Sequence, residues 1–461
     1  RTEQQEGAFY ENGFEWRFEF PEVLDEQGRF VGFDVIIGNP PYIRQEQLHD
    51  LKTYLRKNFE VYDGKADLYA YFIERGIQLL RQGYPFCYIV ANKWMRAGYG
   101  WKLRTWLQNY RLEQLVDFGD LPVFEEATTY PCIMLLQKEA PDESAVFEAA
   151  EPATLDVDAW QEHIRSIRFD VKQTLLPESG WTLVDKDSQR LLKKLREKGT
   201  PLGEYVNGRI YYGIKTGLNE AFVIDEQTRE RFIEEDPGSE EYIKPYLAGR
   251  DIKRYQPPQP NKYLILLKNG WTRSNAGKVS EEKGWEWLND TLPAIAGHLA
   301  QYKEKARKRY DQGEYWWELR ACDYYEEFEK PKIIVPAIVK QGNYTYDNDG
   351  RYSNDKTTII RVDDLSLLGI LNSKLADFVI FNISSTKRGG YYEYKPMYVS
   401  EIPIIEGQKD MKEEIAQKVD QILDLKKENA EADTSSLEEE IDELVFEMYG
   451  VGDEEIAILM T

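Results

Sequence analysis

The segment FDVIIGNPPYIRQE, residues 33–46, constrains the fold of this chain more than any other stretch. Five of its first six residues are apolar or glycine, which predicts a short buried strand. Two prolines follow Asn39, and a proline cannot continue a central strand because it has no backbone N–H to donate. The segment therefore predicts a strand that ends at Asn39, with the ring of Tyr42 just beyond. On these residues alone a plain turn is the alternative, since Asn-Pro commonly starts one.

The residues that follow alternate between helical and strand patterns. Apolar spacing predicts a helix over 68–80, and short apolar runs predict strands at Phe86–Val90, Leu112–Phe118 and Cys132–Lys138. Strands that alternate with helices predict an α/β fold with a parallel sheet, in which the last two strands could pair antiparallel because no helix joins them. Ligands bind such sheets at the carboxyl ends of the strands, where Asn39 would lie.

The second half of the chain has a different character. From residue 201 to about 405 it is rich in short apolar runs, glycine and tyrosine, which predicts an irregular α+β domain with one helix over 367–384. Beyond it, apolar stripes in a charged segment predict a helical hairpin broken at AEADTSS. The predicted divisions are a first domain over 1–150, a linker and helix over 151–200, the second domain over 201–405, and an acidic helical tail over 406–461.

The net charge of −23 argues against nucleic acid as a partner only if it is taken as a whole. Residues 406–461 hold five basic and eighteen acidic side chains, and this difference accounts for more than half of the net negative charge. The stretch Lys244–Lys278 instead holds eight basic residues and one acidic residue. Because local charge decides phosphate contact, DNA binding is not excluded.

Three cysteines and three histidines lie far apart in the sequence, so we expect neither a metal site nor a disulfide framework. We find no signal peptide and no apolar run long enough to cross a membrane, and we expect a reducing, cytoplasmic compartment. The start at Arg1, without a methionine, favours a fragment of a longer protein.

Several blocks carry a resemblance to a known family. NPPY at a strand end resembles motif IV of amino-group DNA methyltransferases, and FEWRFEFPEV with FDVIIGNPPYIRQE, GKADLYAYFIE and YPFCYIVANKWM is similar to type IIG restriction-modification enzymes. GIKTGLNEAFVID, IKPYLAGRDIKRY and KPKIIVPAI resemble the TaqI-type specificity domain. The order is that of the gamma class, whose members methylate N6 of adenine. The resemblance implies a partial Rossmann-like methyltransferase sheet, then an α+β target-recognition domain that binds double-stranded DNA, and S-adenosylmethionine as cofactor.

The resemblance also implies roles for particular residues. The side-chain carbonyl of Asn39 and the backbone carbonyl of Pro40 would accept hydrogen bonds from the amino group of a flipped base, and Tyr42 would stack on that base. Phe124 would cover its other side, unless it only packs its own loop. Lys65 and Asp67 either lie near the base or give polarity to a helix start.

The predicted DNA contacts are Lys215 and Thr216 in GIKTG, Arg250, Lys253 and Arg254 in the basic stretch, and Lys387 and Arg388 in STKRGGYYEYKP. Solvated charged loops are the alternative for the last two groups, and base contacts cannot be separated from phosphate contacts by sequence.

One family feature is missing from the sequence. The glycine-rich loop that binds S-adenosylmethionine precedes motif IV, but only 38 residues precede Asn39 and none resembles it. We therefore expect the main cofactor loop, the N-terminal methyltransferase half and any nuclease domain upstream of this chain, which alone would be inactive. A non-catalytic DNA-binding specificity module is one alternative. N4-cytosine methylation is another, since it uses the same acceptors, although tyrosine after Asn-Pro-Pro favours adenine.

Overall fold

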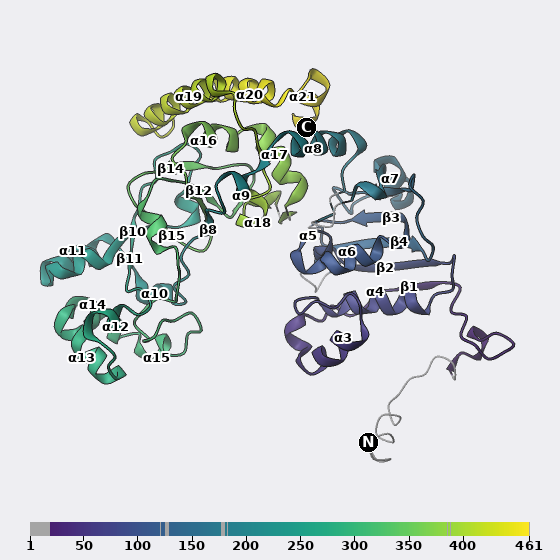
Figure 1. The fold of residues 1–461 in the computed structure, drawn as a ribbon, viewed down its shortest axis with the longest axis horizontal. Coiled ribbons are helices and arrows are strands. Elements are labelled where there is room, and N and C mark those ends of the chain that lie inside the picture. The colour runs from purple at the N-terminus through teal and green to yellow at the C-terminus, as the bar shows by residue number, and fades with distance from the viewer. Residues whose placement is uncertain are drawn as a thin grey trace, which may run out of the picture. The chain divides into compact units, whose positions relative to one another are not determined.

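A computed structural model describes residues 19–119, 121–124, 129–176, 180–181, 183–384, 386–387 and 389–460 (Figure 1). The chain forms two compact units. The first comprises Arg1–Arg190 with Ser385–Gly389, and the second comprises Leu191–Ser384 with Gly390–Thr461. Both mix helices and strands, which confirms the predicted α/β class.

The first unit is built on a six-stranded sheet. Its strands, in spatial order, are β1 (Ile36–Gly38), β2 (Pro85–Ala91), β4 (Pro131–Gln137), β3 (Arg111–Asp117), β5 (Val146–Ala150) and β6 (Phe169–Lys172). β1 pairs with β2 in parallel, and β3 with β5, whereas β4 is antiparallel to both β2 and β3. The antiparallel pairing that the sequence allowed for its third and fourth strands is therefore confirmed. β1, β2 and β3 all run the same way, so their carboxyl ends meet at one edge of the sheet.

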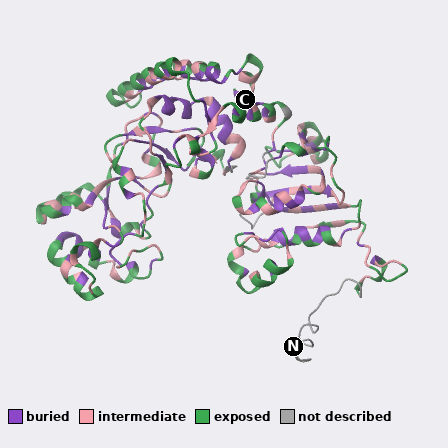
Figure 2. Cartoon of the chain, in the orientation of Figure 1, coloured by how far each residue is buried: buried purple, intermediate pink, exposed green. Residues whose placement is uncertain are grey.

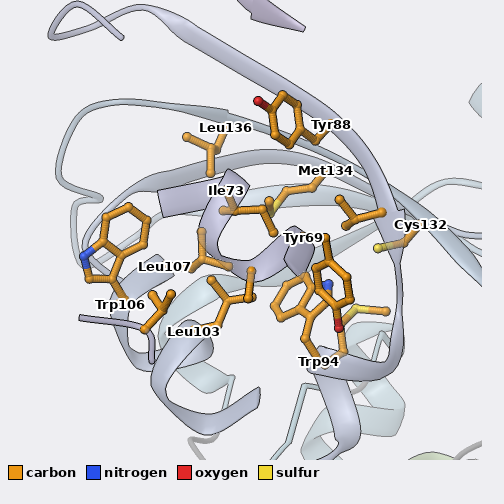
Figure 3. Packing of buried hydrophobic residues seen from close by; sticks show 14 of the residues in the cluster. Tyr69, Ile73, Tyr88, Trp94, Leu103, Trp106, Leu107, Cys132, Met134 and Leu136 are labelled. Carbon is orange, nitrogen blue, oxygen red and sulfur yellow. The ribbon is translucent and has the colours of Figure 1, made fainter. Parts of the chain in front are cut away.

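Alternate residues of these strands enter two separate cores. On one face, α4 (Leu68–Leu79) and α6 (Trp101–Leu107) pack against β2, β3 and β4, and Figure 3 shows Ile73, Leu107 and Met134 meeting in this core. On the other face, α7 (Trp160–Ile167) packs against Val116 of β3 and its neighbours. This two-sided burial fixes the strands that carry the loops at the carboxyl edge.

The sheet continues past residue 150, where the sequence predicted a linker and a helix. Residues 139–185 contain β5, α7 and β6, and β5 pairs antiparallel with β6. Phe147, Ala149 and Val171 are buried, but β5 has only five residues and β6 only four, so neither strand is long enough to show a clear apolar period. The predicted division of the chain into domains stays a prediction.

At the other end of the sheet, β1 pairs only with β2 among the described strands. Among the described residues nothing covers its face away from α4, since Ile37 is 75% exposed and the preceding Val35 is 58% exposed, while Phe86 and Val90 of β2 are buried. Figure 2 shows buried residues along the middle strands of this sheet.

The second unit contains two four-stranded sheets. One has the order β15 (Tyr352–Ser353), β10 (Ile243–Leu247), β11 (Lys262–Ile265) and β9 (Val223–Ile224). The other has the order β14 (Thr345–Asp347), β12 (Lys332–Pro336), β16 (Thr357–Ile360) and β8 (Ile210–Tyr212). In addition, β13 (Ile338–Val339) pairs antiparallel with β18 (Tyr391–Glu393). Helices α11 (Glu226–Glu235), α12 (Trp271–Ala276), α13 (Glu281–Thr291), α14 (Pro293–Ala300) and α15 (Lys303–Ala306) lie between the strands in sequence.

The single helix predicted over 367–384 is wrong, because two helices occupy this segment. α16 (Leu365–Leu371) and α17 (Lys374–Ile383) meet at a bend of 56°. The side chain of Ser373 accepts a hydrogen bond from the Ala376 N–H and starts the second helix, which apolar spacing alone could not reveal. Among the described residues no single helix is long and apolar enough to cross a membrane. The bent pair passes that test by length and composition, but it is mostly buried inside the second unit.

The predicted helical hairpin at the C-terminal end is confirmed by α19 (Lys409–Glu428) and α20 (Ser435–Tyr449). Its buried stripe includes Ile415, Val419 and Ile441. These side chains pack on Gly369 of α16, where an added Cβ would lie 2.5 Å from a methyl of Ile415. The hairpin is thus an integral layer of the second unit.

Candidate catalytic loop and nucleic-acid interface

The loop after β1 presents two unused hydrogen-bond acceptors. The side chain of Asn39 is exposed, whereas Pro40 is buried. Neither the Asn39 side chain nor the Pro40 carbonyl accepts a hydrogen bond from any described residue. The chain can pass here because Gly38 has no side chain: an added Cβ would lie 2.9 Å from the Tyr88 ring. Both acceptors are therefore free at the carboxyl edge of the sheet.

Tyr42 lies half-buried just after these acceptors. Burial raises the pKa of Tyr42 to about 12, and the Cys132 thiol adds to the effect. Its hydroxyl is buried and has no hydrogen-bond partner among the described residues. Such groups are rare in folded proteins. The ring is thus an uncharged phenol at neutral pH, with its hydroxyl turned into the protein.

The structure brings Tyr42 and Phe124 together. Phe124 follows β3, and its ring centroid lies 5.6 Å from that of Tyr42 at an interplanar angle of 60°. This is an edge-to-face contact of the kind that aromatic pairs favour. A base stacked between two rings needs a spacing of roughly 7 Å, twice the rise of stacked bases. The two rings are therefore in contact, and they must move apart before a base fits between them.

Asp67 ties the loop that contains Tyr42 to the start of α4. Its Oδ1 accepts a hydrogen bond of 2.9 Å from the Gln45 N–H, and the Leu68 N–H donates to the Ile43 carbonyl at 3.0 Å. Burial raises the pKa of Asp67, while the bond from Gln45 lowers it. The described contacts of Asp67 thus position the loop, and Lys65 nearby is exposed.

A polar cluster that sequence reasoning missed orders the segment leading to Phe124. The amide of Asn92, after β2, donates to Oδ1 of Asp117 at 2.7 Å, and the Gly119 N–H donates to the same oxygen at 3.0 Å. Arg96 Nη2 lies 3.9 Å from the other oxygen of Asp117. The available signal was a polar residue at the carboxyl end of each of two apolar strands.

The second unit contains a basic groove of about 960 Å³. None of its lining residues is acidic, and four are cationic: Arg250, Lys253, Lys340 and Lys356. Apolar residues such as Ile252 and Val339 form part of the lining, and the amides Gln341, Asn343 and Asn354 also border it. The cations suit the charged phosphates of a polyanion such as DNA, and the amides suit the hydrogen-bonding groups of its bases.

The cations of this groove are directed to solvent. Arg250 is 82% exposed, and its nearest carboxylate is that of its neighbour Asp251, at 3.9 Å. Lys340 Nζ lies 5.5 Å from the centre of the Tyr391 ring, and Lys356 pairs with Asp355 at 3.2 Å. Gly249 allows its segment to approach the segment of Lys356 closely, since a Cβ on Gly249 would lie 2.8 Å from the Lys356 carbonyl.

Regions of both units match known protein families. Residues 2–124 match the Eco57I restriction-modification methylase family, and residues 244–404 match the TaqI-like C-terminal specificity domain. These matches support a TaqI-like type II restriction-modification methyltransferase.

Individual relatives agree with this assignment. Type II methyltransferase M.BstVI of Geobacillus stearothermophilus is 23% identical over 396 residues, which cover 81% of this chain and 67% of that protein. RM.Eco57I of Escherichia coli, a type II restriction enzyme and methyltransferase, is 27% identical over 340 residues, 68% of this chain and 33% of that protein. The fold is similar to that of the type IIL restriction-modification enzyme MmeI, with a TM-score of 0.63 and 14% identity over 97% of this chain and 58% of MmeI. The chain thus spans about a third to two thirds of these proteins.

The predicted DNA contacts differ in their surroundings. Arg250 and Lys253 line the groove. Arg254 instead points inward, where its Nε lies 2.6 Å from Glu438 and its Nη1 donates to the Gly342 carbonyl at 2.9 Å. The described contacts of Arg254 therefore support the domain itself.

The GIKTG motif also makes internal contacts. Thr216 is 1% exposed, its hydroxyl donates to Asn219 at 2.6 Å, and its carbonyl accepts from Arg309. Lys215 is half-exposed and its Nζ lies 2.7 Å from Asp311. A Cβ on Gly213 would lie 1.8 Å from the Asn354 carbonyl, so this glycine permits close approach to the groove.

The remaining predicted contacts lie in the segment that groups with the first unit. Lys387 Nζ lies 5.9 Å from the centre of the Tyr130 ring. Arg388 lies outside the described residues. In the part of the chain that the structure describes, no group of three or more acidic, histidine or cysteine side chains could hold a metal ion.

Proposed function

We propose that this chain is part of an enzyme that methylates the N6 amino group of an adenine flipped out of duplex DNA, within a restriction-modification system. The observation that carries the proposal is the exposed amide of Asn39, three residues before Tyr42, whose ring packs on that of Phe124. Family membership supports DNA methylation. The basic groove of the specificity domain supports DNA as the partner.

The chemistry follows from what the loop can do to an amine. The lone pair of an exocyclic amine is delocalised into the base, which makes the nitrogen a poor nucleophile. Asn39 Oδ1 and the Pro40 carbonyl would each accept a hydrogen bond from one of the two N–H groups of the amine. These two hydrogen bonds would draw the nitrogen towards tetrahedral geometry and localise its lone pair. Because both acceptors are held by a short strand and by Pro41, little reorganisation is needed. S-adenosylmethionine supplies the methyl group when bound.

The described residues do not complete a site for this cofactor. The position next to β1 on its outer side is empty of any described strand, and Ile37 and Val35 are exposed there. We propose that the main cofactor loop lies on further strands of the sheet, upstream of this chain, and that helices between those strands would cover these side chains. On this proposal the chain alone binds DNA but does not transfer a methyl group.

Adenine is preferred over cytosine because of the tyrosine after Asn-Pro-Pro and the domain order, although N4 of cytosine suits the same two acceptors. The test is to express the full-length enzyme in a host without DNA methylation and to analyse nucleosides by mass spectrometry. We expect N6-methyladenine with the wild type and none with Asn39→Ala. N4-methylcytosine would refute the adenine assignment. DNA binding without any methylated nucleoside would favour a non-catalytic specificity module.

A further inference from the structure

Two amide side chains border the basic groove without serving the fold. Gln341 is exposed and Asn343 is half-buried, and neither side chain has a hydrogen bond to any described residue. Nearby amides behave differently. Asn354 Oδ1 accepts from the Lys356 N–H at 3.1 Å, and Asn372 both accepts from and donates to Tyr344. The hydrogen-bonding capacity of Gln341 and Asn343 is therefore available to a ligand.

The backbone between these two amides is fixed from both sides. The Gly342 N–H donates to Asp377 Oδ1 at 2.8 Å, and the Gly342 carbonyl accepts from Arg254 at 2.9 Å. A Cβ on Gly342 would lie 2.9 Å from Asp377 Oδ1, so only glycine fits without a shift. A loop held in this way presents its side chains without the entropy cost that a mobile loop pays on binding.

The surrounding charges indicate the class of ligand. Lys340 precedes the two amides in sequence, and Arg250, Lys253 and Lys356 line the same groove without an acidic residue among them. Phosphates would satisfy the four cations, but they give amides no selective role. Amide side chains pair in a bidentate manner with N6 and N7 of adenine in the major groove. Duplex DNA meets both demands at once.

We propose that Gln341 and Asn343 are specificity-determining residues that read base edges, while the cations of the groove hold the phosphates. The proposal rests on the proposed function only in that it requires duplex DNA as the partner. Arg254 and Asp377 are then positioning residues, because they act through Gly342. One bidentate amide contact discriminates between bases by roughly five- to a hundredfold.

The test is a binding selection from a randomised duplex library with the full-length protein, followed by sequencing. We expect the wild type to enrich a motif. Gln341→Ala should lose preference at one position of that motif by about five- to a hundredfold, and Asn343→Ala at another, while the other positions and binding to unrelated DNA stay unchanged. Gln341→Glu should shift the preference at its position towards cytosine, because a carboxylate accepts from N4. Gln227→Ala, an exposed amide outside the groove, is the matched control and should leave the motif intact.

Because binding is measured rather than methylation, failure here is distinct from failure of the proposed activity. A motif that survives both alanine variants would overturn the proposal, as would a wild-type protein without sequence preference. Uniform relaxation at every position would show that these amides act only through the fold. Tighter binding of single-stranded RNA than of duplex DNA would also refute it.

Discussion

The rings of Tyr42 and Phe124 pack on each other, with centroids 5.6 Å apart, although they follow different strands of the sheet. An aromatic pair of this kind is worth about 0.5–1.5 kcal/mol, and stacking of a base about 1–3 kcal/mol. Exchange of one contact for the other is therefore nearly balanced or favourable. If the proposed function is correct, the two rings would therefore separate around a base without a large net loss of contact free energy.

From this relationship we predict that Tyr42→Ala and Phe124→Ala each reduce the population of flipped base by about ten- to a hundredfold, and that the double variant costs less than the product. The measurement is the fluorescence of 2-aminopurine at the target position, bound to the full-length enzyme. Tyr84→Ala, which removes an exposed ring packed on Arg81 in the same unit, is the control. Independent, multiplying losses would show that the two rings do not hold one object.

The groove yields a prediction about salt. Charge reversal of Arg250 and Lys253 should weaken DNA binding and lower the slope of log affinity against log salt by about 0.9 for each lost phosphate contact. Arg231→Glu, which reverses an exposed cation on α11 outside the groove, is the matched control. The measurement is a set of DNA-binding titrations at salt concentrations from about 50 to about 200 mM, a range over which such slopes are clear. An unchanged slope in the double variant would place the phosphates elsewhere.

Arg254 should behave differently from its neighbour Lys253. Arg254→Met removes the cation that pairs with Glu438 Oε2 and the donor to the Gly342 carbonyl, so we expect a loss of about 1–3 kcal/mol in the free energy of unfolding. Removal of Glu438 as well, in Arg254→Met with Glu438→Leu, should recover part of this loss because no unpaired charge remains. Chemical denaturation measures both, and the salt slope of DNA binding should stay that of the wild type. A lower slope in folded Arg254→Met would return this residue to the phosphate contacts.

The hairpin gives a prediction that concerns packing alone. Gly369→Ala adds a methyl group 2.5 Å from Ile415, in a contact between α16 and α19 that leaves no room. Overpacking of this kind costs about 1–3 kcal/mol, measured by chemical denaturation. Gly297→Ala is the control, because no atom lies within 4 Å of its added Cβ and α14 favours alanine. Equal stability of both variants would mean that the hairpin is loosely attached.

The parts of the fold that the sequence predicted are those with strong local patterns. The apolar runs gave β2, β3 and β4, and the order of strands placed Tyr42 and Phe124 at one edge. The helix over 367–384 was wrong because Ser373 starts a new helix, a hydrogen bond that apolar spacing does not encode. The groove was only half predicted, since Lys340 and Lys356 lie far from Arg250 in sequence. They join it through sheet pairing and the close approach at Gly249, which are long-range contacts.

Asp377 provides the last prediction, which tests the anchor of the loop between Gln341 and Asn343. Burial raises the pKa of Asp377 to about 6, Tyr394, Arg254 and the Gly342 N–H lower it in part, and Asp442 raises it further. In the unfolded chain the pKa of an aspartate is about 3.9. The folded state therefore binds the proton more tightly, and the free energy of unfolding falls as pH rises from about 4 to about 6 and is level above that range.

Asp377→Asn keeps Oδ1, which accepts from both Gly342 and Tyr394, and removes only the charge. We expect this variant to gain about 2 kcal/mol relative to the wild type between pH 4.5 and pH 7.5, in chemical denaturation followed by tryptophan fluorescence. Asp290→Asn, at an exposed position, should show no such gain. If the two curves of Asp377→Asn and wild type run parallel across this range, the carboxyl group at position 377 is ionised without penalty, and burial does not set its charge.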